Sequence, residues 1–172
     1  MLPSIVKEPN PILHRKAVDV TKITEEIQQF IDTMIETMYV AHGVGLAANQ
    51  IGSNRNILVT SEHQERGQEV VLINPAIVQR SGKARSQEGC LSVPGVSSEI
   101  TRAAQVTVTG LNREGKLVTL KAKGLLAKIL QHEVDHLQGH LYWDRLRFFE
   151  RRRLCEQYKS LSQSLDQIDL NL

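Results

Sequence analysis

Apolar residues recur at intervals of three and four along two stretches of the chain, the spacing that places them on one face of a helix. The first stretch predicts a helix over about 24–42. The second predicts a helix over 125–137 that ends near Gly139. A further helix is expected over 148–164.

Between these helices the pattern changes to short runs of β-type sequence. The predicted strands cover 56–60, 69–73, 76–80, 105–109 and 116–121, and a hairpin turn over 112–115 joins the last two. The glycine-rich segment 43–52 is too apolar for a solvated loop, and we expect a buried turn that leads into a strand. Because strands and helices do not alternate, the pattern favours an α+β fold with a mainly antiparallel sheet.

Length and composition are consistent with one compact domain over 1–172. The chain has 172 residues, of which 41% are hydrophobic, and this is enough for a single core. It lacks both the apolar segment of a signal peptide and a run long enough to span a membrane, so we expect a cytoplasmic protein without a membrane partner. Two cysteines make no disulfide framework, and 4% aromatic residues disfavour a base-stacking surface.

The net charge of +2 lies in the last part of the chain. Five arginines gather at the start of the predicted C-terminal helix: Arg145, Arg147, Arg151, Arg152 and Arg153. Such a cluster is either a solvated basic face or a surface for the phosphates of RNA.

The clearest chemical signal is an HExxH motif within the second predicted helix. His132 and His136 are four residues apart, so both imidazoles leave the same face and can hold one metal ion. Glu133 stands beside that ion, where a carboxylate can take a proton from a water whose pKa the metal lowers. The motif therefore predicts metal-assisted hydrolysis.

Two imidazoles leave the metal site incomplete, and the residues alone leave two candidates for the third ligand. Glu156 lies 20 residues beyond His136, a spacing at which a zinc endopeptidase could take a carboxylate. Cys90 follows Gly89, and its thiolate would be a strong ligand for Zn²⁺ or Fe²⁺. Residue chemistry does not decide between them.

Three segments together resemble the signature motifs of the bacterial peptide deformylases. They are GVGLAANQ at 43–50, EGCLS at 88–92 and QHEVDHL at 131–137, in the order of that family and roughly at its spacing. The similarity extends over about 5–146. It implies an antiparallel sheet packed around a central helix that carries HExxH, with an additional C-terminal helix.

The resemblance also implies a metal centre. In this family the Cys of the second motif and both His of the third hold the metal, which here are Cys90, His132 and His136. The metal is commonly Fe²⁺, and Zn²⁺, Ni²⁺ or Co²⁺ can occupy the same site. A Cys–His–His set implies that Glu156 is not a ligand.

The substrate implied is the N-formylmethionyl end of a nascent polypeptide, hydrolysed to formate and a free amino terminus. Glu133 would transfer the proton, and the Gln50 side chain with the Leu91 backbone N–H would stabilise the oxyanion. The substrate would lie along the backbone of Val44 and Gly45. The walls of the methionine pocket are expected to be Val44, Leu125 and Ile129.

Two other functions are consistent with parts of the sequence. One is a zinc endopeptidase that uses His132, His136 and Glu156 as ligands. The other is a non-catalytic module that binds the ribosome or RNA through the C-terminal arginines, a contact that the family resemblance also implies for the terminal helix.

Overall fold

The main element of the fold is a five-stranded antiparallel sheet. The computed structural model describes residues 2–169, so Met1 and residues 170–172 of the predicted domain lie outside the described residues. The strand order is β1-β2-β3-β6-β7, and every pairing is antiparallel. The strands are β1 (Gly45–Ala47), β2 (Ile57–Thr60), β3 (Val70–Ser81), β6 (Gln105–Leu111) and β7 (Leu117–Lys123). The predicted α+β class with antiparallel pairing is confirmed.

The structure corrects the prediction of two separate strands over 69–73 and 76–80. Both belong to β3, which continues through a bulge at Asn74 and Pro75. Asn74 has a positive φ of 53°, and its side-chain amide pairs with both the N–H and the C=O of Val20. An Asn-Pro pair usually indicates a turn. Here it produces a bend within one strand.

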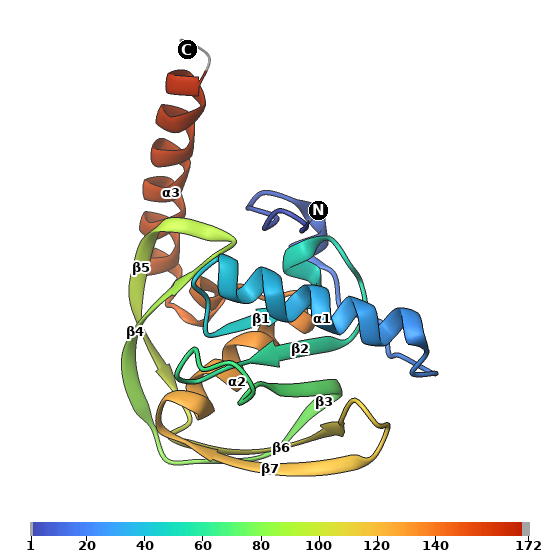
Figure 1. The fold of residues 1–172 in the computed structure, drawn as a ribbon. Coiled ribbons are helices and arrows are strands. Elements are labelled where there is room, and N and C mark those ends of the chain that lie inside the picture. The colour runs from blue at the N-terminus through green and yellow to red at the C-terminus, as the bar shows by residue number, and fades with distance from the viewer. Residues whose placement is uncertain (1, 170–172) are drawn as a thin grey trace.

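A second sheet was not predicted from the sequence. It is a two-stranded hairpin of β4 (Ala84–Cys90) and β5 (Val93–Arg102), which Figure 1 shows curving along one side of the molecule. Its strands lack an apolar run because only one face is partly buried, and β4 is composed mostly of polar residues. The pattern of apolar residues therefore predicted no strand in this segment, although it forms an antiparallel ladder with a register shift between Glu88 and Cys90.

The helices are α1 (Glu25–Val40), α2 (Gly124–Leu137) and α3 (Phe148–Asp169), with 3₁₀ turns η1 (Pro11–His14), η2 (Ala48–Ile51) and η3 (Tyr142–Arg145). Successive side chains of the central strands point to opposite faces of the large sheet, and both faces are apolar. Ile57 and Val59 pack with α1, whereas Leu58 packs with α2. The sheet is therefore covered by α1 on one face and by α2 on the other (Figure 1).

The third helix packs against the hairpin. Leu154 and Tyr158 of α3 belong to a core cluster with Trp143 of η3 and Val96 of β5. The Tyr158 hydroxyl also donates a hydrogen bond of 3.0 Å to the Glu8 carbonyl. Among the described residues, no helix has the length and apolar character needed to cross a membrane.

The loop after α2 gives a prediction about stability. Gly139 has φ of +81°, and a Cβ there would lie 2.7 Å from the His14 carbonyl oxygen. Gly67 has a similar φ of +87° but open space around it. We expect Gly139→Ala to lower the free energy of unfolding by about 3 kcal/mol, and Gly67→Ala by about 1 kcal/mol, because only the first adds a clash to the backbone strain. Urea unfolding of both variants checks this, and equal losses would contradict it.

Candidate metal centre

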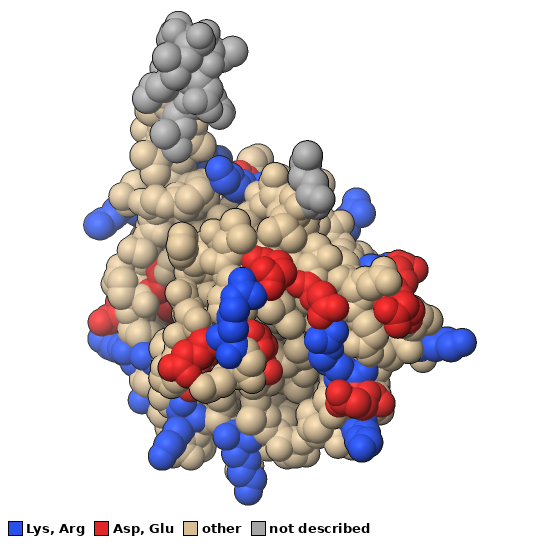
Figure 2. Space-filling model, viewed as in Figure 1, with Lys and Arg blue, Asp and Glu red and all other residues tan. Residues whose placement is uncertain are grey.

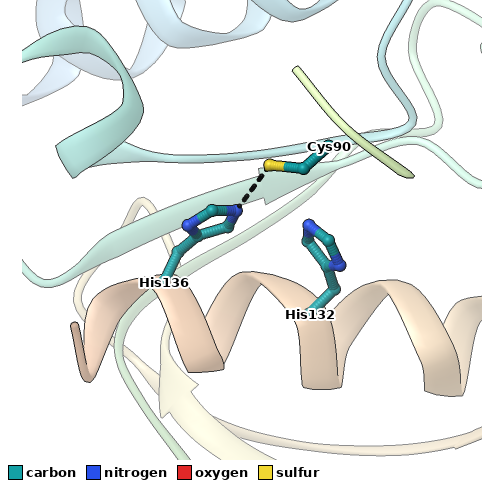
Figure 3. Close-up of side chains that lie close together, drawn as sticks. All are labelled: Cys90, His132 and His136. Atoms are coloured by element: carbon teal, nitrogen blue, oxygen red, sulfur yellow. Dashed lines mark hydrogen bonds between the residues drawn. The ribbon is translucent and has the colours of Figure 1, made fainter. Parts of the chain in front are cut away.

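Three potential metal ligands converge where the hairpin meets helix α2. His132 and His136 leave the same face of α2, and Cys90 is the last residue of β4 (Figure 3). The Cys90 Sγ lies 3.1 Å from the His136 Nε2, and the ligand atoms of all three residues lie within 4.8 Å of one another. Among the side chains that the structure describes, no other group of this kind occurs.

The donor set fits a catalytic metal site. Ligands bound to one tetrahedral ion at 2.0–2.3 Å lie roughly 3.5 Å apart, close to the spacing of these atoms. One sulfur and two imidazole nitrogens also leave a fourth position open, as catalytic sites require. The residues present therefore fit a divalent cation such as Fe²⁺ or Zn²⁺.

A buried carboxylate orients His132 from behind. The His132 Nδ1 lies 3.1 Å from the Glu88 carboxylate, which leaves the other ring nitrogen for the cluster. Arg102 in turn donates to both oxygens of Glu88, at 2.6 and 2.9 Å. A carboxylate on the second ring nitrogen fixes the ring orientation of a metal-binding histidine.

Arg102 also connects this assembly to the next turn of α2. Its Nη1 donates to Asp135 at 2.8 Å, and Asp135 is bonded on its other side by Arg145. Burial alone would raise the pKa of Asp135, but the hydrogen bonds and charges of the two arginines lower it. Asp135 and Arg145 thus extend the Glu88–Arg102 pair into a network of four charged side chains.

The electrostatics of the cluster favour a positive charge. Burial opposes ionisation of Glu88, yet the contacts with His132 and Arg102 lower its pKa to about 2. Burial likewise opposes the charged form of His132, but hydrogen bonds with Cys90 and Glu88 raise its pKa to about 10. Burial, with the charges of His132 and Arg102, lowers the pKa of His136 and keeps that ring neutral. The Cys90 sulfur and the Glu88 carboxylate therefore favour the charged form of the His132 ring that lies between them.

Glu133 lies beside the cluster in a different environment. Its side chain is buried, and its Oε2 has no hydrogen-bond partner among the described residues. Burial is the main reason why its pKa rises to about 7. Gly45 faces this carboxylate so closely that a Cβ at position 45 would lie 2.5 Å from the Glu133 Oε1. The Glu133 carboxylate therefore lies against the Gly45 backbone, and its Oε2 has no hydrogen-bond partner among the described residues.

Gln50 presents its amide to the same cluster. Its Oε1 accepts the Ala47 N–H at 2.9 Å, which fixes the side chain within η2. Its Nε2 then points toward the Cys90 Sγ at 3.6 Å and the Ser92 Oγ at 3.3 Å. A side-chain N–H donor therefore lies at the edge of the candidate metal centre.

An open cavity of about 570 Å³ leads to these groups. Most of the residues that the sequence singled out line it: Val44, Gly45, Gln50, Cys90, Leu91, Leu125, Ile129, His132 and Glu133. His136 is almost fully buried and does not line the cavity. Sequence reasoning missed Ser86 and Lys128, which also line it. Lys128 could have been found from its place one turn before His132, whereas Ser86 required knowledge of strand β4.

The other sequence candidate for a ligand lies apart from the cluster. Glu156 is on α3, where its side chain is 63% exposed and forms an ion pair with Arg152. The zinc endopeptidase alternative requires a carboxylate as the third ligand beside His132 and His136. Among the described residues, the third potential ligand in this group is Cys90.

Comparison with known proteins identifies the family of this chain. The family model described as polypeptide deformylase matches residues 2–152. A peptide deformylase of Halothermothrix orenii is 49% identical over 137 residues, covering 80% of this chain and 88% of that protein. The crystal structure of a peptide deformylase from Legionella pneumophila has a TM-score of 0.87 and 39% identity, covering 95% of this chain and 98% of that one. This chain therefore belongs to the polypeptide deformylase family.

Proposed function

We propose that this chain is a metal-dependent amide hydrolase of a single catalytic domain that removes the formyl group from the N-formylmethionyl end of nascent polypeptides. Family membership supports the activity. The observation that carries the proposal is the Cys90–His132–His136 cluster next to the unpartnered carboxylate of Glu133. These groups meet at a cavity open to a peptide chain.

The Cys90 sulfur and the imidazoles of His132 and His136 would hold one divalent cation, with Fe²⁺ the expected metal and Zn²⁺, Ni²⁺ or Co²⁺ able to replace it. When bound, such a cation supplies Lewis acidity toward the formyl oxygen and lowers the pKa of a water. Glu88 and Arg102 keep the His132 ring in the orientation for binding.

Glu133 moves the proton. Its carboxylate accepts a proton from the attacking water as the water oxygen bonds to the formyl carbon. It then gives that proton to the amide nitrogen as the C–N bond breaks, which releases formate and a free amino terminus. A carboxyl group with a pKa of about 7 serves well in both directions near neutral pH.

Donors and walls position the substrate. The Gln50 Nε2 and the Leu91 backbone N–H donate to the oxygen that becomes negative during attack. The backbone of Val44 and Gly45, at the start of β1, lies along the cavity and pairs with the peptide as an added strand would. Val44, Leu125 and Ile129 form the apolar walls around the first side chain.

The C-terminal arginines support a ribosome contact in the cytoplasm. Several arginines of the predicted cluster are already paired, since Arg145 contacts Asp135, Arg151 contacts Asp144 and Arg152 contacts Glu156. Arg147 and Arg153 are exposed and form no ion pair with described residues. On the face shown in Figure 2, basic side chains lie beside acidic ones. Elsewhere in the chain, arginines also form ion pairs at the surface, such as Arg66–Glu36 and Arg113–Asp32.

Substitution of Glu133 gives a test of the proposed mechanism. We expect Glu133→Ala to lower kcat for formyl-Met-Ala-Ser by about a thousandfold or more, because proton transfer is lost. The metal content should stay at the wild-type value, since Glu133 is not a ligand. Formate release and metal content are measured on the same preparation, with Glu156→Ala as the control. Full activity of Glu133→Ala would contradict the mechanism.

The ribosome contact is tested by substitution rather than deletion, because α3 contributes Leu154 and Tyr158 to the core. We expect Arg147→Gln with Arg153→Gln to weaken co-sedimentation with ribosomes at low salt by about tenfold, and to reduce its salt dependence. A control with the same charge change replaces Lys83 and Lys121, which are exposed elsewhere. Equal binding by both double variants would contradict the contact.

A further inference from the structure

Ser86 and Lys128 are two of the polar side chains that line the active-site cavity outside the proposed catalytic groups. Ser86 lies on β4, where a period of two places it on the same side of the strand as Glu88 and Cys90. Lys128 lies on α2 one turn before His132. Each side chain therefore lies on an element that also carries a candidate metal ligand.

Neither polar group has a partner among the described residues. The Ser86 Oγ is buried and makes no hydrogen bond. Lys128 is half-buried, and no carboxylate lies within ion-pair distance of it. A buried donor without an acceptor is costly, and an apolar side chain bound here leaves that cost in place. The chemistry that relieves it is a hydrogen-bond acceptor on the ligand.

The neighbouring charges favour a neutral acceptor over a carboxylate. The Glu133 carboxyl group also lines the cavity and has no hydrogen-bond partner on its Oε2, so in its ionised form it repels a second anion. The apolar walls of Leu125 and Ile129 also favour an aliphatic stem on the bound side chain. A sulfoxide meets both conditions, because its S=O oxygen is a neutral acceptor on a methionine stem.

We propose that this pocket also accepts N-formyl peptides whose first side chain ends in a neutral oxygen acceptor, with formyl-methionine sulfoxide as the representative substrate. The Lys128 ammonium and the Ser86 hydroxyl, after rotation about its χ1, donate hydrogen bonds to that oxygen. This inference rests on the proposed deformylase function. It extends the substrate class to peptides whose first methionine has an oxidised side chain.

The experiment compares three peptides that differ only in the first residue: formyl-methionine, formyl-methionine sulfoxide and formyl-norleucine, each followed by Ala-Ser. Norleucine keeps the length of methionine without an acceptor. The enzymes are the metal-loaded wild type, Lys128→Met, Ser86→Ala and the control Lys121→Met, whose side chain is exposed on β7. The readout is the ratio of kcat/KM for the sulfoxide peptide to kcat/KM for the norleucine peptide.

We expect the wild type to use the sulfoxide peptide within about tenfold of the norleucine peptide, and Lys128→Met to lower the ratio by about fivefold or more, mainly through KM. Ser86→Ala lowers the ratio less, and Lys121→Met keeps the wild-type value. Rejection of the sulfoxide peptide by more than about a hundredfold, or an unchanged ratio in both pocket variants, would overturn this inference alone. Failure of the wild type to use formyl-methionine would overturn the proposed function, and this inference with it.

Discussion

The candidate metal centre depends on the buried guanidinium of Arg102. This side chain comes from the end of β5 and bonds to Glu88 of β4 and to Asp135 of α2, so that it fastens the hairpin to the central helix. Together with the core cluster that packs Val96 against η3 and α3, this contact brings the Cys90 sulfur to two imidazoles more than 40 positions away in the sequence. Removing one member of such a buried ion network leaves the others uncompensated, which typically costs 3–5 kcal/mol. The contact that joins the hairpin to α2 therefore also helps to hold the three candidate ligands together.

The contacts of Arg102 and Arg145 give two neighbouring carboxyl groups of α2, those of Asp135 and Glu133, different environments. Asp135 has two arginines, which lower its pKa, and it serves to hold the layers together. Glu133 is two residues earlier, has no partner on its Oε2, and has a pKa that burial raises to about 7. Carboxyl groups whose environments separate their pKa values in this way are a common basis for dividing structural and proton-transfer roles. The arrangement lets a single helix provide ligands, proton carrier and anchor.

The sequence predicted much of this where the signal was local. Helical periodicity placed α2, and the spacing of His132 and His136 was sufficient to predict their shared face. The third ligand was not decided by residue chemistry, because Cys90 and Glu156 were both acceptable by spacing and only the tertiary fold separates them. The hairpin β4–β5 was not predicted because its strands are polar and only half-buried. For the same reason, the position of Ser86 in the cavity wall was missed. The family resemblance supplied what periodicity could not.

The most direct test of the central claim is X-ray absorption spectroscopy of the zinc-loaded protein, because it reports the ligand atoms themselves. The account predicts one sulfur at about 2.3 Å and two imidazole nitrogens at about 2.0–2.1 Å, with one lighter atom completing the shell. Replacement of Cys90 by Ser should remove the sulfur signal, whereas Glu156→Ala should leave the spectrum unchanged. A shell of nitrogen and oxygen atoms without sulfur in the unsubstituted protein would contradict the Cys90–His132–His136 centre.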